Sequence, residues 1–162
     1  MPNSDTLQKL DLDSFVPYRL SVLSNRVSSA IAHEYSERFG LTIPEWRVMA
    51  VLGQSPGLSS RAVAERTAMD KVQVSRAVAS LGESGRVQKE IDSEDGRVAR
   101  LTLTKKGRAI YDDIVPLALH LEEVLLGALT AEERASFDRL MAKLDARVSQ
   151  LAISSLAYDQ DR

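Results

Sequence analysis

The stretch of the chain that decides its fold covers residues 59–104, SSRAVAERTAMDKVQVSRAVASLGESGRVQKEIDSEDGRVARLTLT. Its first half predicts two short helices joined by a tight turn. The first helix is expected to run from about Ser59 to Arg66, because Ser59 or Ser60 can cap it. The second helix is expected to open at Asp70, whose carboxylate suits an N-cap position.

The second helix has an apolar face and a polar face. Val74, Val78 and Leu81 recur at helical spacing and are expected to face a core. Gln73 stands three residues after the N-cap residue, so the two can form a capping box, and Gly85 is expected to end the helix. The polar face carries amide, hydroxyl and cationic groups that suit base edges and phosphates in a major groove. Its residues are Lys71, Gln73, Ser75 and Arg76.

The second half of the stretch predicts a β-hairpin. Alternating positions on both sides of a turn-rich loop, residues 92–96, show the period of two that is typical of strands. These positions are Val87, Lys89, Ile91, Leu101 and Leu103. Two helices, a tight turn and a charged hairpin, in this order, predict a winged helix-turn-helix.

Charge is segregated along the chain. The whole sequence has 21 Lys and Arg against 23 Asp and Glu, a net charge of −2. Residues 59–108 hold 11 basic and 7 acidic residues, net +4, and the remainder is net −6. A basic module on an acidic body would direct one surface toward phosphate. The alternative is an ordinary solvated face, and its residues would be Arg61, Arg66, Arg86, Lys105, Lys106 and Arg108.

Length and composition restrict the class of protein. The 162 residues fit one domain of usual size, and cysteine is absent, which excludes disulfides, thiolate metal sites and thiol-based sensing. A polar N-terminus and the lack of a long apolar run predict a cytoplasmic protein with no membrane span. The chain shows no metal-ligand spacing, nucleophile elbow or phosphate loop, so we predict neither enzymatic activity nor a cofactor.

Long helices are expected on both sides of this module. An apolar stripe from Leu20 to Tyr35 predicts a helix closed by Gly40, and a stripe from Ile110 to Leu125 predicts another that Pro116 should bend. Two further helices have capping pairs, Thr42 with Glu45 and Thr130 with Glu133. Because a compact winged helix needs little more than its own core, these stripes are expected to pack in a homodimer. The alternative is packing within one subunit.

Two segments of the chain resemble the MarR family of bacterial transcription regulators. One is Asp95-Gly96-Arg97 with residues 101–107, LTLTKKG, and the other is residues 41–49, LTIPEWRVM. The resemblance extends over roughly residues 15–150. It implies a mainly α fold with a small β-hairpin wing, in which long terminal helices form a dimer. It also implies double-stranded DNA as the partner, read as a pseudo-palindrome with half-sites about 10 base pairs apart.

The resemblance also divides the chain. Residues 1–14 would be a polar N-terminal tail and 156–162 a C-terminal tail, 15–40 and 108–155 the dimerisation helices, and 41–107 the DNA-binding domain. The predicted DNA-binding residues are Ser59, Ser60, Arg61, Lys71, Gln73, Val74, Ser75, Arg76, Arg97 and Arg100. Asp95 is expected to hold Arg97, the wing residue for the minor groove, and Gly96 to serve the hairpin turn.

Regulators of this family commonly release DNA when a small aromatic or phenolic molecule binds. The candidate effector residues are Tyr18, Arg19, His33, Trp46 and Arg47. An arginine could pair with a carboxylate and the tryptophan could stack on a ring, so we predict a repressor released by an aromatic carboxylate or its thioester. Alternatively, Trp46 belongs to the core and Arg47 pairs with Glu45 or Glu34. The remaining alternative functions are a protein-interaction module and a DNA-binding module that needs no ligand.

Overall fold

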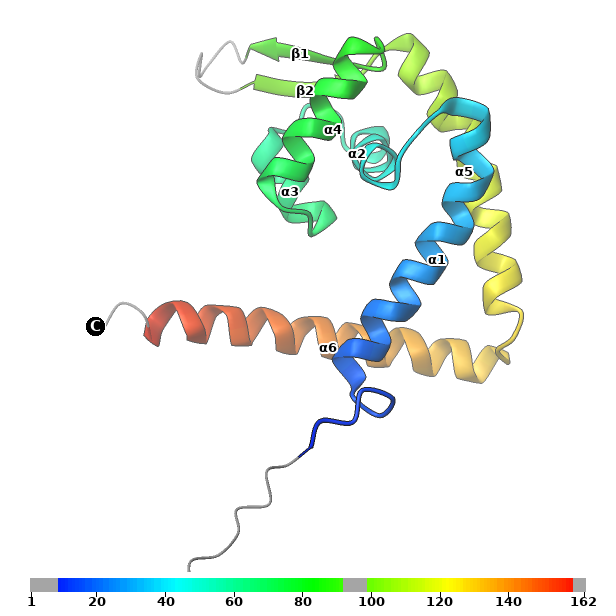
Figure 1. Ribbon diagram of the computed structural model, residues 1–162, viewed down its shortest axis with the longest axis vertical. Coiled ribbons are helices and arrows are strands. Elements are labelled where there is room, and N and C mark those ends of the chain that lie inside the picture. Colours follow the sequence, from blue (N-terminus) through cyan, green and yellow to red (C-terminus); the bar gives the residue numbers. More distant parts are fainter. Residues whose placement is uncertain (1–8, 92–98, 159–162) are drawn as a thin grey trace, which may run out of the picture. The chain divides into compact units, whose positions relative to one another are not determined.

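The computed structural model describes residues 9–91 and 99–158, with side chains as far as residue 151. Within these residues the fold is mainly helical, with one two-stranded antiparallel sheet (Figure 1). The elements are α1 (Val16–Phe39), α2 (Ile43–Gln54), α3 (Ser60–Thr67), α4 (Lys71–Glu83), β1 (Val87–Ile91), β2 (Ala99–Leu103), α5 (Lys105–Leu126) and α6 (Ala131–Tyr158). They fall into two compact units, Met1–Ala118 and Leu119–Arg162.

The predicted helix-turn-helix is confirmed, and its two helices begin within one residue of the predicted positions. Ser59 is the N-cap of α3, and its hydroxyl accepts a hydrogen bond from the Ala62 N–H at 3.2 Å. Helix α3 ends at Thr67, because Ala68 turns into the left-handed region with φ of 52°. Asp70 then caps α4 by accepting from the Gln73 N–H at 2.8 Å. These bonds satisfy amide donors that a helix start would otherwise leave unpaired.

Helix α4 ends in a Schellman turn. Gly85 takes φ of 68°, a conformation that glycine adopts without a steric penalty. The Gly85 N–H donates to the Gly82 carbonyl at 3.0 Å, and the Arg86 N–H donates to the Leu81 carbonyl at 2.8 Å. This pair of bonds closes the helix and sends the chain directly into β1.

The hairpin is present and is anchored at its base. Strands β1 and β2 pair in the register Val87 to Leu103 and Ile91 to Ala99. Leu101 is buried, and its backbone also bonds to the loop after α2, where Leu58 forms an isolated bridge with it. The predicted alternation fails toward the tip, because Ile91 is 76% exposed. The turn that joins the strands, residues 92–98, lies outside the described residues.

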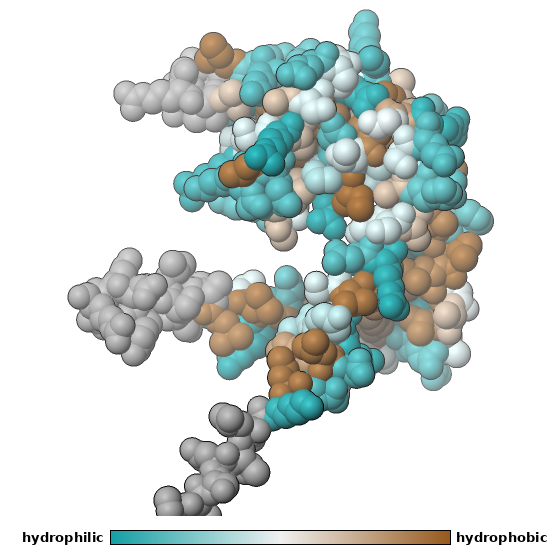
Figure 2. Space-filling view, viewed as in Figure 1, coloured by the Kyte–Doolittle hydropathy of each residue, from teal (hydrophilic) through white to brown (hydrophobic). Residues whose placement is uncertain are grey.

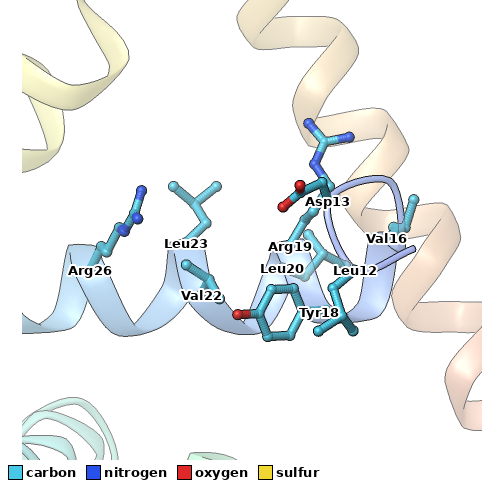
Figure 3. A pocket seen from close by; sticks show the side chains of 9 residues that line it. All are labelled: Leu12, Asp13, Val16, Tyr18, Arg19, Leu20, Val22, Leu23 and Arg26. Carbon is cyan, nitrogen blue, oxygen red and sulfur yellow. The ribbon is translucent and has the colours of Figure 1, made fainter. Parts of the chain in front are cut away.

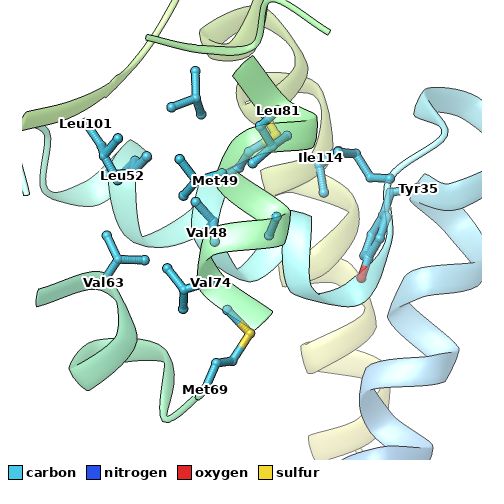
Figure 4. Close-up of a cluster of buried hydrophobic side chains, with 14 residues drawn as sticks. Tyr35, Val48, Met49, Leu52, Val63, Met69, Val74, Leu81, Leu101 and Ile114 are labelled. Carbon is cyan, nitrogen blue, oxygen red and sulfur yellow. The ribbon is translucent and has the colours of Figure 1, made fainter. Parts of the chain in front are cut away.

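The core packs α4 against α2 and α3 (Figure 4). The buried stripe of α4 meets a buried face of α2, and Val63 of α3 and Leu101 of β2 complete the cluster. The stripe consists of Val74, Ala77, Val78 and Leu81, and the face of α2 consists of Val48, Met49 and Leu52. Each buried valine, leucine or methionine side chain contributes roughly 1.5–3 kcal/mol when it leaves water, so this stripe fixes which face of α4 points outward.

The capping of the flanking helices is confirmed. Gly40 ends α1 with φ of 60°, Thr42 and Glu45 form a reciprocal capping box on α2, and Thr130 with Glu133 caps α6. Pro116 lies inside α5. No single helix in the described part of the chain is long and apolar enough to cross a membrane.

The apolar stripes of the flanking helices are exposed in part. Leu20, Leu23 and Leu125 are exposed, whereas Tyr35 and Ile114, from the same two predicted stripes, are buried in the core. On the face shown in Figure 2, apolar surface gathers along the N-terminal part of α1. Along α6 the exposed apolar residues are Phe137, Leu140, Met141, Leu144, Val148 and Leu151.

Two glycines offer a matched test of the packing at the base of the hairpin. At Gly107, in the first turn of α5, an added Cβ would overlap the Arg86 carbonyl, whereas at Gly82, in α4, the nearest atom is 4.0 Å away. Gly107→Ala should therefore lower the free energy of unfolding by about 1–3 kcal/mol. Gly82→Ala should raise it by about 0.5–1 kcal/mol. Urea unfolding measures both, and equal effects of the two substitutions would contradict this packing.

Candidate nucleic-acid interface

Helix α4 presents an exposed polar face opposite its buried stripe. Lys71, Gln73, Ser75 and Arg76 are all exposed, as the sequence predicts. The Asp70 carboxylate is held by the Gln73 N–H, so it stays at the start of the helix as a cap. The exposed side chains offer cationic, amide and hydroxyl groups on one rigid element, which is the chemistry that base edges and phosphates require.

Val74 is predicted both to face the core and to contact DNA; the first prediction is confirmed, and the second is wrong for its side chain. Val74 is 1% exposed and belongs to the cluster between α4 and α2. The exposed valine of this helix is Val72, which is 59% exposed and which the sequence reasoning missed. Helical geometry could have found it, because a residue two positions before a buried one on a helix lies roughly 200° around the axis.

Helix α3 and the residue before it contribute three of the predicted side chains. Ser59 is used as the cap, whereas Ser60 and Arg61 are exposed. Arg61 pairs with Glu65 one turn later, with 3.1 Å between Arg61 Nε and Glu65 Oε1. Both side chains are well exposed, so the pair contributes little to stability and leaves the guanidinium accessible to a phosphate.

The described part of the wing carries one predicted DNA contact, Arg100. Its Nη1 donates to the Gly57 carbonyl at 3.2 Å, so this exposed side chain braces β2 against the loop after α2. Asp95, Gly96 and Arg97 lie outside the described residues, and their predicted roles remain predictions.

Several of the basic residues that could have formed an ordinary solvated face instead make hydrogen bonds within the protein. Arg108 donates to the Gly53 carbonyl at 3.1 Å and lies over the Tyr111 ring, 5.0 Å from its centre. Lys106 Nζ donates to the Ser84 carbonyl at 2.8 Å. Part of the regional positive charge therefore holds the module together, whereas Lys71 and Arg76 on α4 are exposed and form no ion pair within the described residues.

A buried carboxylate connects the start of α2 to α4. Glu45 is 8% exposed, and its Oε2 accepts from the Thr42 N–H at 2.7 Å and from Thr42 Oγ1 at 2.8 Å. Its Oε1 accepts from the hydroxyl of Ser80 on α4. Burial alone would raise the pKa of Glu45, but the bonds from Ser80 and Thr42 and the charge of Arg86 outweigh burial and lower it.

Arg86 extends this connection to the end of α1. Its Nη2 donates to the carbonyl of Phe39, the last residue of α1. Since Arg86 follows directly on the closing turn of α4, the C-terminal end of α4 and the junction of α1 and α2 share one polar network. This network and the apolar core together hold α4 in a fixed orientation.

The candidate effector residues do not form one group. Trp46 lies between Tyr35 and Tyr111, with its ring tilted against theirs and 5.7 and 5.9 Å from their ring centres, so it is part of an aromatic cluster at the edge of the core. Arg47 Nη2 donates to Ser28 Oγ at 3.2 Å. Burial raises the pKa of Tyr35 to about 12, although the charge of Arg47 acts in the opposite direction.

The three remaining candidate effector residues, Tyr18, Arg19 and His33, all lie on α1. Tyr18 and Arg19 line an open depression on its N-terminal half (Figure 3). Arg19 is nine residues before Ser28, which corresponds to roughly 14 Å along a helix. His33 is exposed on the same helix. The part of the structure that is described therefore places Arg47 with Ser28 and Tyr35, and separates it from Tyr18 and Arg19.

Comparison with known proteins identifies the class. The MarR family model matches residues 39–98. The HTH-type transcriptional repressor Rv2887 of Mycobacterium tuberculosis is 30% identical over 131 residues, 80% of this chain and 91% of that protein. The crystal structure of a MarR/EmrR family transcriptional regulator from Acinetobacter sp. ADP1 is 27% identical with a TM-score of 0.80, covering 87% of this chain and 99% of that chain.

A third similar protein is described together with a ligand. The BpsR structure from Bordetella bronchiseptica concerns regulation of its DNA binding by 6-hydroxynicotinic acid, and it is 25% identical with a TM-score of 0.73. It covers 85% of this chain and 97% of that chain. The chain belongs to the MarR family of winged helix-turn-helix transcriptional regulators. It is a DNA-binding regulator and not an enzyme.

The polar network predicts a dependence of stability on pH. Because the folded-state pKa of Glu45 is lowered, its contribution is present above the ordinary value of 4.5 and is lost as the pH falls through the folded-state pKa. Glu45→Gln should destabilise the protein at pH 7, and this deficit should shrink on acidification. Urea midpoints at a series of pH values measure it.

A matched control is Glu65→Gln, which removes an exposed carboxylate. The free energy of unfolding of this variant should stay close to that of the wild type at every pH, because exposed ion pairs contribute little to stability. Parallel loss of stability by wild type and Glu45→Gln on acidification would show that the Glu45 network has no such role.

Proposed function

We propose that the protein is a dimeric repressor whose α4 helices read a pseudo-palindromic operator in the major groove. The observation that carries the proposal is the exposed face of α4, with Lys71, Gln73, Ser75 and Arg76 opposite a stripe buried in the core. A helix whose inward face is fixed by packing can be placed against bases without losing its orientation. Ser60 and Arg61 would contact phosphates, and Arg97 would extend from the wing to the adjacent minor groove.

The exposed apolar stripes support a homodimer. Leu20 and Leu23 on α1, and Leu140, Leu144 and Leu151 on α6, remain exposed on the isolated chain. Large apolar side chains that stay exposed along one helix are typical of a protein interface. A two-fold dimer would present two copies of α4, so half-sites about one turn of DNA apart, roughly 10 base pairs, would match its symmetry.

Arg47 and the groups around it are the basis for an effector site. Its guanidinium bonds to the hydroxyl of Ser28 and lies close enough to Tyr35 to act on its pKa, and the Tyr35 ring in turn contacts the Trp46 ring at a tilt. A carboxylate could pair with the guanidinium while an aromatic ring packs on the cluster. BpsR, a similar regulator, is described with the aromatic carboxylate 6-hydroxynicotinic acid. We infer an effector of that class, which would weaken operator binding on entering this site.

DNA recognition by α4 is tested by removing one of its cations. Arg76→Ala should weaken binding to a duplex selected by the wild type at least fivefold, because a good contact to a base edge is worth about 1–3 kcal/mol. Fluorescence anisotropy at two salt concentrations measures this, with a scrambled duplex for comparison. Arg139→Ala removes the same charge from an exposed position on α6 and should bind like the wild type.

Two results would contradict the proposal in different ways. Equal, weak binding of the wild type to both duplexes would favour the protein-interaction alternative. Unchanged selective binding by Arg76→Ala would mean that α4 is not the reading element.

The effector proposal is tested with 6-hydroxynicotinic acid and a series of phenolic acids. A member that binds should raise the melting temperature and weaken operator affinity, by about 5- to 150-fold for a coupling of typical size. Arg47→Ala should lose both effects, whereas Arg26→Ala, an exposed arginine on α1, should keep them. If no member changes either quantity, the effector proposal falls and DNA binding stands.

A further inference from the structure

Val72 is an exposed apolar side chain at the centre of the outward face of α4. Its relative exposure is 59%. On a helix with 100° per residue, the four buried residues of α4 centre roughly 190° around the axis from Val72. Arg76 and Ala79, both exposed, lie within about 40° of Val72 on that projection. Lys71 and Gln73 lie on the two sides of Val72 around the helix axis, so Val72 is surrounded by polar residues.

The distribution of exposed apolar residues makes this position unusual. Among the described residues from 41 to 107, the large apolar side chains left exposed are Val72 and Ile91. The other exposed ones lie in residues 10–23 or on α5 and α6, where the proposed dimer would cover them. Val72 is on α4 and Ile91 is on the wing strand, the two elements that a winged helix-turn-helix uses against DNA.

Folding does not account for a valine at this position. Its side chain is mostly outside the core, and a β-branched residue is a poorer helix former than alanine, lysine or glutamine. The side chains around it also favour a partner that carries negative charge, because Lys71 and Arg76 are exposed beside it. Ser75 and Ala79 are small, which allows close approach of the helix to a surface.

The apolar group that the major groove offers is the methyl group of thymine, displayed among donors and acceptors. We propose that Val72 contacts a thymine methyl group and thereby makes the protein prefer thymine at one position of each half-site. This inference rests on the proposed insertion of α4 into the major groove. It assigns specificity to a side chain that can make no hydrogen bond.

The test uses deoxyuridine, which differs from thymidine in DNA only by lacking that methyl group. A half-site is first obtained by selection from a random duplex library with the full-length wild type. Each thymine of one half-site is then replaced singly by deoxyuridine, and the affinities are measured by anisotropy. At one thymine the replacement should weaken wild-type binding about fourfold, the factor that corresponds to burying one methyl group.

Val72→Ala should bind the thymine duplex more weakly and should no longer distinguish it from the deoxyuridine duplex at that position. Arg76→Ala is the matched comparison on the same face. It should weaken binding to both duplexes equally and retain the wild-type ratio between them. Because alanine is the better helix former, the melting temperature of Val72→Ala should not fall.

The outcomes separate this inference from the function on which it rests. If the library selection enriches no site, both the operator-binding proposal and the inference fall. If a site is enriched but no deoxyuridine replacement weakens wild-type binding, the inference alone is wrong. It is also wrong if Val72→Ala keeps the full wild-type preference at every thymine.

Discussion

The packing of one face of α4 against α2 is the constraint on which the rest of the structure depends. Val74, Val78 and Leu81 are buried, so the helix cannot rotate about its axis without exposing apolar side chains to water. The same packing leaves the opposite face of α4 exposed to solvent and so determines which side chains can contact a partner. Caps at Ser59 and Asp70 and the turn at Gly85 then set where the helices begin and end.

A second set of interactions, all polar, links this helix to the rest of the first unit. The Glu45 carboxylate bonds to Ser80 of α4, and Arg86 bonds to the carbonyl of Phe39 at the end of α1. These bonds connect the end of α1 and the start of α2 to the C-terminal end of α4. Buried polar groups of this kind are costly to leave unpaired, so the network favours a single arrangement.

Local features of the fold were predictable from sequence because they depend on neighbours in the chain. The capping boxes of α2 and α6, the Asp70 cap of α4, Gly40, Gly85 and the helical stripes each depend on residues within one or two turns. Of the capping box expected at Asp70, only the bond from the Gln73 N–H is formed. The contacts Ser80 to Glu45, Arg86 to Phe39 and Arg108 to Gly53 join residues 35, 47 and 55 positions apart, and no spacing pattern indicates them.

The difference between local and long-range contacts also explains which parts of the candidate site could not be predicted from sequence. Val74 and Val72 have identical side chains, and only their angle on the helix separates core from surface. The aromatic environment of Trp46 required tertiary structure, because its partners Tyr35 and Tyr111 come from other helices. Arg47 could not be assigned to Ser28 from sequence, since carboxylates close to it in the chain offered equally plausible partners.

The most direct measurement of the central claim is site-directed cross-linking of α4 to the major groove. The chain has no cysteine, so Ser75→Cys introduces a single thiol on the outward face of α4. A duplex that carries a mixed disulfide with a small thiol, tethered to a major-groove base edge of the selected half-site, should exchange with this variant, forming a protein–DNA disulfide and releasing the small thiol. Glu132→Cys, exposed on α6, should not react above background. Equal reaction of the two variants, or reaction of Glu132→Cys alone, would contradict the placement of α4 in the major groove.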